Sequence, residues 1–299
     1  MKHNTLPHTQ LTLSQCGLGA SPFGNIYNQP VSQKEAQHIV NYALDNGINY
    51  IDVAPYYGKT RAETLLGNCL PKNRKSVILS TKVGRYDTHE FDFSATRTKR
   101  SIQESLTRLQ TDYIDIIFCH DIEFADHDIL MSETIPTLAK LKQAGVINHI
   151  GISGYPLPLL TKTATHPDIS IVLSYGHYNI VNTTLQDHLP TFHNANVDVI
   201  NASPFCMGLL TKNNCPSWHP YPNKQLLHTK IQTLYKKGIH VTKTAFQFAY
   251  HNSNAITTLV GINQLTDLKE CLSWISEPPT TQTVSEIQSL LLEKNNLAW

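Results

Sequence analysis

The sequence predicts a parallel α/β fold and, within that class, a closed (β/α)8 barrel, the TIM-barrel architecture. Short runs of β-branched and other apolar residues recur along the 299 residues, and most of them are separated by one stretch with helical periodicity. Strands that alternate with helices in this way indicate parallel βαβ units. The chain also exceeds the roughly 250 residues that such a barrel needs. We therefore expect one barrel domain over residues 1–299, without a linker, a low-complexity segment or an internal repeat.

The expected strands are the short apolar runs, most of them rich in Ile, Val and Leu, which are favoured in strands buried on both faces. In chain order they are Cys16–Ala20, Ile48–Val53, Ser76–Lys82, Tyr113–Cys119, Val146–Ile152, Ile171–Ser174, Val197–Ala202 and Ile256–Val260.

The expected helices are the amphipathic stretches between these strands. Gly47 and Gly145 directly follow two of them, where glycine commonly ends a helix, and Ser94 is a suitable N-cap for a third. The segment Pro204–Asn223 is the longest irregular piece, and loops of this length are often lids or binding loops. The helices are Val31–Asn46, Ala62–Asn68, Ser94–Leu109, Ser132–Ala144, Lys224–Lys237, Thr242–His251 and a last one that opens over Leu265–Ser273.

An open, doubly wound sheet shares this alternation and is the alternative fold. Such a sheet normally carries the pattern G-x-G-x-x-G after its first strand, with an acidic residue further on. Here the segment from Gly17 to Pro22 reads GLGASP, which lacks the third glycine and has a proline where the helix would begin. The closed barrel therefore fits better.

Composition and charge are those of an ordinary globular protein, with 40% hydrophobic residues, 16% charged residues and a formal net charge of +1. This balance attracts neither nucleic acid nor an anionic membrane, so we expect neither as a partner. Residues 1–10 are polar and unlike a signal peptide, and no apolar run approaches the roughly 18 residues of a membrane span. Six scattered cysteines without a C-x-x-C pair favour free thiols in a reducing cytoplasm over disulfides or a metal site. They are Cys16, Cys69, Cys119, Cys206, Cys215 and Cys271.

Polar residues end several predicted strands, and in a parallel barrel these ends meet at the face where active sites lie. The second, third and fourth strands end at Asp52, Lys82 and His120, and Tyr57 follows the second strand. Each of these residues alone is as well explained by a turn, a solvated strand end or packing. Their placement on successive strands is what indicates a site. Later strands end in serine, at Ser153, Ser174 and Ser203.

Asp52, Tyr57, Lys82 and His120 form a chemically coherent set for moving a proton. A free tyrosine has a pKa of about 10, and a neighbouring ammonium group lowers that pKa by favouring the phenolate. Lys82 can supply the ammonium group, and Asp52 can hold Lys82 through an ion pair. His120 can then orient a substrate oxygen while Tyr57 exchanges a proton with a carbonyl or an alcohol. The protein has no hydride carrier of its own, so such an oxidoreductase needs a cofactor.

Five segments resemble sequence blocks of the aldo-keto reductase family, in order, over nearly the whole chain. Ordered blocks at matching strand ends are more specific than any one of them. The resemblance implies a nicotinamide cofactor and a small-molecule substrate, and it places the family's catalytic tetrad on Asp52, Tyr57, Lys82 and His120. The five blocks are Asp52–Gly58 (DVAPYYG), Ser80–Gly84 (STKVG), Cys119–Asp121 (CHD), Gly151–Gly154 (GISG) and Asn201–Pro204 (NASP).

The resemblance also implies a set of cofactor contacts. Ser153 matches a position that binds the nicotinamide carboxamide, and Ser174 stands where many members have glutamine. The loop from Ser203 to Leu210 matches the one that covers the cofactor pyrophosphate, whereas Ala202 stands where members often have the tyrosine that stacks on the nicotinamide. The implied contacts are Gly19, Ser153, Gly154, Ser174, Ser203, Pro204, Met207, Gly208, Leu209, Gly261, Gln264 and Glu270.

The segment after the eighth strand favours NAD, although the N-terminus of the following helix leaves NADP possible. Members that favour NADP carry basic residues here, which bind the 2′-phosphate. Gly261 and Asp267 stand at the matching positions, and a carboxylate repels a phosphate. Asn263 and Gln264 can instead hydrogen-bond a ribose hydroxyl, and Lys269 falls on a different face of the helix from Asp267.

The segments Ser203–Thr211 and Trp218–Pro220 are similar to the branch of the family that oxidises free aldoses at C1. Trp218 either stacks on a sugar or anchors a loop, and Tyr27 and Tyr86 either line the pocket or are ordinary surface aromatics. Two alternatives stay open: an enzyme for another small carbonyl or alcohol, pyridoxal included, and a redox-sensing regulatory subunit like the potassium-channel β subunits. The implied substrate contacts are Tyr27, Tyr57, Tyr86, His120 and Trp218.

Overall fold

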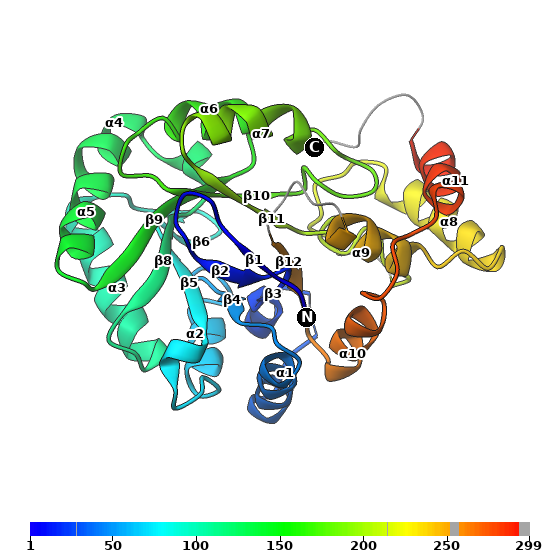
Figure 1. Ribbon diagram of the computed structural model, residues 1–299, viewed down its shortest axis with the longest axis horizontal. Helices are drawn as coiled ribbons and strands as arrows, with labels where there is room; N and C mark the ends of the chain where they lie inside the picture. The colour runs from blue at the N-terminus through cyan, green and yellow to red at the C-terminus, as the bar shows by residue number, and fades with distance from the viewer. Residues whose placement is uncertain (28, 214, 252–256, 293–299) are drawn as a thin grey trace.

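The structure, a computed structural model, describes residues 1–27, 29–213, 215–251 and 257–292. At its centre lies a closed barrel of eight parallel strands in the order β10-β11-β12-β3-β4-β5-β8-β9 (Figure 1). The predicted (β/α)8 barrel is confirmed, and the described ends of the expected strands agree within two residues. Ile256, where the eighth strand was expected to begin, and the last seven residues of the expected domain lie outside the described residues. The strands are β3 (Cys16–Gly19), β4 (Tyr50–Asp52), β5 (Ile78–Val83), β8 (Ile114–Cys119), β9 (Ile147–Gly154), β10 (Ile171–Tyr175), β11 (Asp198–Ala202) and β12 (Thr258–Gly261).

The strand register brings the predicted site residues to one end of the barrel. Gly19 pairs with Asp52, and Asp52 pairs with Ser80. Lys82 lies two residues further along β5 and pairs with Phe118, one residue before β8 ends. Because the strands are parallel, Asp52, Lys82 and the residue after β8, His120, open on the same face.

An N-terminal hairpin closes the opposite end of the barrel. It consists of β1 (His3–Thr5) and β2 (Thr12–Ser14), drawn in dark blue across the barrel in Figure 1. Thr9, in its turn, donates two hydrogen bonds to Asp198 at the start of β11, from its backbone N–H (2.8 Å) and its hydroxyl (2.7 Å). The hairpin adds two leucines to the apolar side chains that fill the barrel. These are Leu6 and Leu13, packed with Tyr50, Ile116, Phe118, Ile171, Leu173, Ile200 and Leu259.

The predicted helices are present, with ends that differ by no more than three residues. Ser94 caps α3 as predicted, because its hydroxyl accepts the Arg97 N–H at 3.2 Å. The helix expected from Ser132 begins differently: a short α4 (His127–Ile129) and a π-helical turn, Leu130–Thr134, precede α5. The confirmed helices are α1 (Gln33–Asp45), α2 (Arg61–Gly67), α3 (Ala95–Leu109), α5 (Ile135–Gln143), α8 (Lys224–Lys236), α9 (Val241–His251) and α10 (Leu265–Ser273).

Several elements were not predicted. Pro156 and Pro158 surround the start of α6 (Leu157–Thr163), and Pro190 lies inside α7 (Leu185–Asn194). Proline usually marks a loop or a helix end, so these two helices were missed. The others are the N-terminal hairpin, α4 with the π-helical turn after it, α11 (Thr281–Leu291), a hairpin of β6 (Arg85–Asp87) and β7 (Glu90–Phe91), and the 3₁₀ turns η1 (Ser21–Gly24), η2 (Arg74–Ser76) and η3 (Ile122–Phe124).

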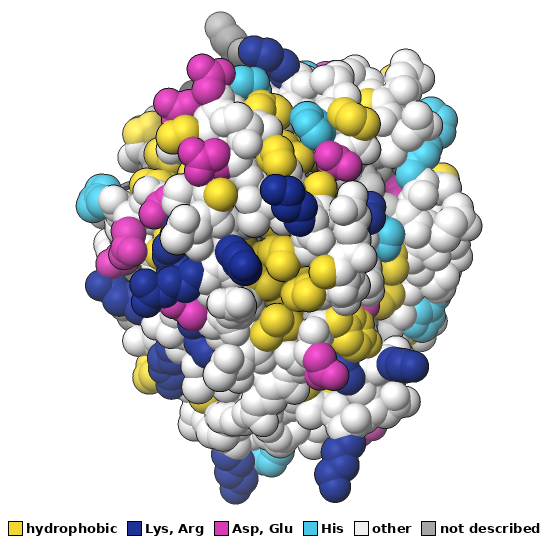
Figure 2. Space-filling view, turned by 90° about the vertical axis from the view of Figure 1, so that its left-hand side faces the viewer, with side chains coloured by type: hydrophobic (Ala, Val, Ile, Leu, Met, Phe, Trp, Pro, Cys, Tyr) yellow, Lys and Arg dark blue, Asp and Glu magenta, His cyan; other side chains and the backbone are white. Residues whose placement is uncertain are grey.

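The surface agrees with the balanced composition. Figure 2 shows one side of the molecule, where acidic and basic side chains are both scattered across the face. Among the described residues, no helix combines the length and the apolar character that crossing a bilayer requires.

Candidate active site

A buried ion pair stands at the carboxyl ends of β4 and β5. Lys82 Nζ lies 2.7 Å from Asp52 Oδ2 and also donates to the Val53 carbonyl at 2.9 Å. The second carboxylate oxygen accepts the Ser80 hydroxyl at 2.6 Å, and Ser80 Oγ lies 3.0 Å from the Tyr50 hydroxyl. Asp52 is 5% exposed and Lys82 is 1% exposed. Breaking such a pair is costly, because it leaves one buried charge uncompensated.

Tyr57 and His120 stand beside this ion pair. The Lys82 ammonium group lies 4.8 Å from the centre of the Tyr57 ring. The Tyr57 and His120 rings meet edge to face, with their centroids 5.8 Å apart. The Tyr56 ring also meets the imidazole edge to face, with a centroid distance of 5.8 Å. Tyr57 stays half-buried. The structure thus brings all four residues of the expected tetrad together at the mouth of the barrel.

Burial controls the protonation of both rings. It raises the pKa of Tyr57 well above its ordinary value, and the carboxylates of Asp52 and Asp121 raise that pKa further. Burial also lowers the pKa of His120 to about 3, although Asp121 opposes the shift. The expected lowering of the Tyr57 pKa by Lys82 is not found, because Asp52 already compensates the ammonium charge and burial outweighs it. At neutral pH the pair is therefore a phenol and an uncharged imidazole.

Two glycines fix the loop that carries Tyr57. Gly58, with φ of +65°, packs directly against the backbone of Gly24 at the end of η1. A Cβ on Gly58 would overlap the Gly24 carbonyl, and a Cβ on Gly24 would overlap the backbone of Tyr57 and Gly58. The position of Tyr57 therefore depends on two backbones that touch without an intervening side chain.

Sequence reasoning missed a second ion pair beside His120, formed by Arg85 and Asp121. Asp121 Oδ2 lies 3.6 Å from His120 Nε2, and the Arg85 guanidinium group lies 3.9 Å from the centre of the Tyr56 ring. The position of Asp121, directly after His120, was a signal that could have found it. Arg85 lies three residues after Lys82, on a hairpin that was not predicted.

Glu123, on η3, brings a further carboxyl group to this end of the barrel. Its Oε1 accepts the Tyr155 N–H at 3.1 Å, and its buried Oε2 has no hydrogen-bond partner among the described residues. This oxygen lies 2.5 Å from the point that a Cβ on Gly154 would occupy. Burial, and then the charge of Asp121, raise the pKa of Glu123 to about 7. The carboxyl group is therefore partly protonated at neutral pH.

The serines expected to bind a cofactor lie at the carboxyl ends of β9 and β10. Ser153 Oγ makes two long hydrogen bonds of 3.4 Å, from the Asp121 N–H and to the Cys119 carbonyl. Ser174 Oγ lies 3.2 Å from His177 Nδ1. A hydroxyl has one donor and two acceptor positions, so each serine keeps capacity for another partner. These residues fit a small polar group such as a carboxamide.

The loop after β11 has a backbone suited to an anion. Turns of this kind can point successive N–H groups at one ligand. Leu209 is part of a buried apolar cluster and can offer only its backbone, and the buried Pro204 has no N–H and can offer only its carbonyl. Across the mouth, Gly19 and Gly261 pair in register at the ends of β3 and β12. Four residues of the loop have positive φ: Ser203 (65°), Cys206 (53°), Met207 (50°) and Gly208 (93°).

Carboxylates crowd the N-terminus of α10. Glu35, from α1, accepts the Leu265 N–H at 2.7 Å with its Oε1. Asp267 lies in the first turn of α10, and burial followed by the charges of Glu270 and Glu35 raises its pKa. Sequence reasoning missed Glu35, which is 230 residues away in the chain.

Lys269, the lysine of α10, does not compensate these carboxylates. Lys269 reaches back over the Tyr42 ring of α1, with Nζ 5.4 Å from the ring centre. Gln264 is exposed just before α10 and makes no side-chain cap. A phosphate at this helix end would therefore meet carboxylates rather than Lys269.

Trp218 ties the long irregular loop to the segment after β3. Its indole N–H donates to the Ile26 carbonyl at 2.9 Å, and its ring centre lies 5.8 Å from that of Tyr27. The loop-anchoring interpretation of Trp218 is therefore supported, although 45% of the residue stays exposed. Tyr27 lies close enough to Tyr57 to raise its pKa, which supports a position at the pocket.

Tyr86 does not face the tetrad, contrary to expectation. Its hydroxyl accepts the Gly84 N–H at 3.2 Å, and the Arg97 guanidinium group of α3 lies 3.7 Å from the centre of its ring. The contact with Arg97 places the Tyr86 ring against α3.

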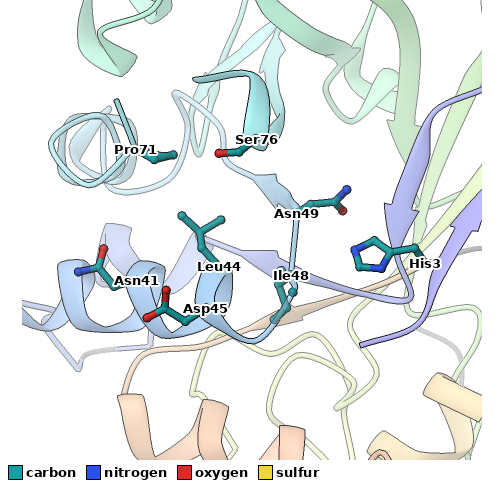
Figure 3. Close-up of a pocket in the computed structure, with 9 residues that line it drawn as sticks. His3, Asn41, Leu44, Asp45, Ile48, Asn49, Pro71 and Ser76 are labelled. Atoms are coloured by element: carbon teal, nitrogen blue, oxygen red, sulfur yellow. The ribbon is translucent and has the colours of Figure 1, made fainter. Parts of the chain in front are cut away.

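A pocket at the other end of the barrel contains none of these residues. Figure 3 shows it beside the end of α1 and the start of β4. Asp52 lies at the opposite end of β4, so this pocket is not the candidate active site. Among the described residues, no group of three or more His, Cys, Asp or Glu side chains could hold a metal ion. The lining residues are His3, Asn41, Leu44, Asp45, Gly47, Ile48, Asn49, Pro71 and Ser76.

Known proteins with similar sequences include several sugar dehydrogenases. L-galactose dehydrogenase from Arabidopsis thaliana is 40% identical, over 98% of this chain and 95% of that protein. D-arabinose 1-dehydrogenase from Saccharomyces cerevisiae is 33% identical, over 72% of this chain and 68% of that protein. D-threo-aldose 1-dehydrogenase from a Pseudomonas species is 31% identical, over 68% of this chain and 69% of that protein.

A solved structure and a family-wide comparison agree with these relatives. The holo form of an aldo-keto reductase from Bacillus halodurans superimposes with a TM-score of 0.80 and 26% identity, over 99% of this chain and 98% of that one. The sequence model of the Aldo/keto reductase family matches residues 15–292. The chain therefore belongs to the aldo/keto reductase family, and it is an oxidoreductase that uses a nicotinamide cofactor and acts on a small molecule.

Proposed function

We propose that this enzyme oxidises a free aldose at C1 to the corresponding lactone, with NAD as the hydride acceptor. The observation that carries the proposal is the buried Asp52–Lys82 ion pair beside Tyr57 and His120 at the barrel mouth. The 40% identity with an L-galactose dehydrogenase over 98% of the chain supports an aldose as the substrate.

The residues of the site divide the work of removing two hydrogens from a sugar. A bound nicotinamide would supply the acceptor for the C1 hydride. His120 is uncharged, because burial lowers its pKa to about 3. It therefore orients the C1 oxygen as a neutral N–H donor. Tyr57 accepts the hydroxyl proton as general base, a role worth roughly 10²–10⁴-fold in rate. Because burial raises the pKa of Tyr57, oxidation should accelerate as pH rises and the phenolate fraction grows.

Lys82 and Asp52 keep the proton-transferring site electrically balanced. The Nζ of Lys82 lies over the face of the Tyr57 ring, where an ammonium group favours the developing phenolate. Asp52 prevents the buried ammonium group from standing alone. We assign to the cofactor the serine, glycine and loop positions described above: Gly19, Ser153, Gly154, Ser174, Ser203, Pro204, Met207, Gly208, Leu209, Gly261, Gln264 and Glu270.

The choice of NAD over NADP rests on the charges around α10. Glu35 already accepts the hydrogen bond from the Leu265 N–H, and Asp267 and Glu270 add two carboxyl groups near this helix end. NADP carries an additional phosphate that normally needs a charge-assisted contact. Lys269, which could supply one, lies over Tyr42 instead.

The test is turnover of the full chain with NAD and a panel of aldoses, monitored by NADH absorbance. We expect steady turnover of at least one aldose, and a loss of 10²-fold or more in kcat for Tyr57→Phe with NADH binding unchanged. Tyr113→Phe is the matched control, because it removes a phenol directly before β8, at the end of the strand away from the site, and should retain most of kcat. Turnover of pyridoxal alone would favour the other-carbonyl alternative, and cofactor binding without turnover would favour a regulatory subunit.

A further inference from the structure

We propose that Asp121, anchored by Arg85, is a positioning residue that holds His120 in the tautomer with its proton on Nε2. The proposal rests on the proposed function in one respect, that His120 acts on the substrate oxygen. Its structural basis is the second ion pair at the barrel mouth, which lies on the opposite side of His120 from its Nδ1 atom.

The two nitrogens of His120 have different surroundings. Nε2 lies 3.6 Å from Asp121 Oδ2, whereas Nδ1 is buried and has no hydrogen-bond partner among the described residues. A carboxylate favours an N–H over a lone pair on the nitrogen that faces it. A buried N–H without a partner is also rarer than an unpaired acceptor. Both effects place the proton on Nε2 and leave Nδ1 as a bare acceptor.

The backbone turns the Asp121 carboxylate back toward the imidazole. Asp121 follows directly after His120 and has φ of +52°, a left-handed conformation that aspartate tolerates better than most residues. Its N–H donates to Ser153 Oγ at 3.4 Å. Asp121 is 3% exposed, so its carboxylate is held within the protein rather than free in solvent.

Arg85 fixes the other side of the carboxylate. Its guanidinium group pairs with Asp121 and lies 3.9 Å from the centre of the Tyr56 ring. Phe91 and Phe124 flank the same group, with ring centres at 5.4 and 5.6 Å. Three aromatic rings around one cation restrict its position. Arg85 therefore acts on His120 through Asp121.

Two balanced ion pairs thus surround the proton-transferring rings. Lys82 and Arg85 lower the pKa of His120, while Asp121 raises it. Charged neighbours also act on the pKa of Tyr57: Asp52 and Asp121 raise it, and Arg85 lowers it. The charged or titratable groups that face these rings are Asp52 on β4, Lys82 on β5, Arg85 on β6, Asp121 and Glu123 after β8, Tyr175 on β10, Tyr27 after β3 and Tyr56 beside Tyr57.

The first experiment reads the tautomer directly, by long-range ¹H–¹⁵N NMR of the full chain with ¹⁵N-labelled histidine. The His120 signals are assigned by their loss in His120→Asn. We expect the wild-type protein to carry the proton on Nε2, and Asp121→Asn to show a mixture of both tautomers. A proton on Nδ1 of wild-type His120 would overturn the proposal. This measurement needs no substrate, so it is independent of whether an aldose is turned over.

The second experiment compares the pH dependence of kcat/KM for oxidation. Asp121→Asn should move the basic limb to lower pH, Arg85→Met should move it to higher pH, and the double variant should return it close to the wild-type position. In Asp121→Asn and the double variant, kcat should still fall at least tenfold. Asp87→Asn is the control, since Asp87 lies on the same hairpin as Arg85 but pairs with the exposed Lys59, and the variant should change neither quantity.

A purely structural role would lower activity without moving the limb in opposite directions. Equal shifts in Asp121→Asn and Arg85→Met would therefore contradict the inference. If no aldose is oxidised but the NMR result holds, the proposed function fails alone. If an aldose is oxidised while His120 carries its proton on Nδ1, this inference fails alone.

Discussion

The Lys82 ammonium nitrogen lies 2.7 Å from the Asp52 carboxylate, in a position where neither residue is more than 5% exposed. Lys82→Met leaves that carboxylate uncompensated beside Tyr57. We expect the variant to lose about 3–5 kcal/mol of unfolding free energy, measured by urea denaturation. The basic limb of the pH–rate profile for oxidation should also move to higher pH, because the unpaired carboxylate raises the pKa of Tyr57.

The double variant Asp52→Asn/Lys82→Met is the control for this pair. It removes both charges, so it should recover most of the stability while staying poorly active. A single Lys82→Met variant as stable as wild type, with an unmoved profile, would show that the two groups are not coupled as described.

Gly58→Ala should lower kcat/KM by up to about 10²-fold, because a displacement near 1 Å at a reacting group has effects of that size. The new methyl group would meet the Gly24 backbone and push Tyr57 aside. Gly145→Ala is a matched control. Gly145 also has positive φ, +74°, but no atom lies within 4 Å of its added Cβ. Gly145→Ala should lose about 1–2 kcal/mol of unfolding free energy and keep its activity. Equal losses of activity in both variants would show that the contact between Gly58 and Gly24 does not position Tyr57.

Glu123 makes stability depend on pH. Its pKa rises from an ordinary 4.5 to about 7 in the folded protein. Between these values the unfolded chain has released the proton and the folded chain retains it, so folding becomes less favourable as pH rises through this window. We expect Glu123→Gln to raise Tm relative to wild type more at pH 8 than at pH 5.

Glu104→Gln is the control of opposite sign. Arginine neighbours lower the pKa of Glu104, so its charged form stabilises the fold above its unfolded pKa. Glu104→Gln should therefore lose Tm relative to wild type at pH 8. If Glu123→Gln gained the same Tm at both pH values, a raised Glu123 pKa would be excluded.

NAD should be preferred over NADP by about 30- to 150-fold in kcat/KM, since one missing and one repulsive contact together amount to roughly 2–3 kcal/mol. Asp267→Asn should narrow that ratio by weakening the repulsion of the 2′-phosphate. Lys269→Ala should leave it unchanged, because Lys269 contacts Tyr42. Equal kcat/KM values for the two cofactors in the wild-type enzyme would refute the assignment.

The barrel and the grouping of the expected tetrad could be predicted from the sequence, because both follow from the order of short segments along the chain. Each strand is a short apolar run, and parallel strands bring consecutive strand ends to one face. Asp52, Lys82 and His120 could therefore be grouped before their distances were known. Helix α7 was missed because Pro190 lies inside it, and such a helix depends on packing rather than on propensity.

In the second ion pair, Asp121 could have been found from its place after His120, but its partner Arg85 could not, since Arg85 is held by contacts between distant segments. Arg85 is held by aromatic rings from three separate segments, at Tyr56, Phe91 and Phe124. The Tyr57 pKa was mispredicted for a related reason. Its direction depends on how deeply the ring is buried, which a sequence does not state.

Among the described residues, the N-terminal hairpin closes the end of the barrel that lies away from the tetrad. Leu6 and Leu13 are fully buried in the floor of the barrel, so nothing can leave through that side. Substrate, product and both forms of the cofactor therefore share the opposite opening. The molecule that is bound deeper in this opening can therefore dissociate only after the one above it. Product-inhibition patterns would report which of the two leaves first.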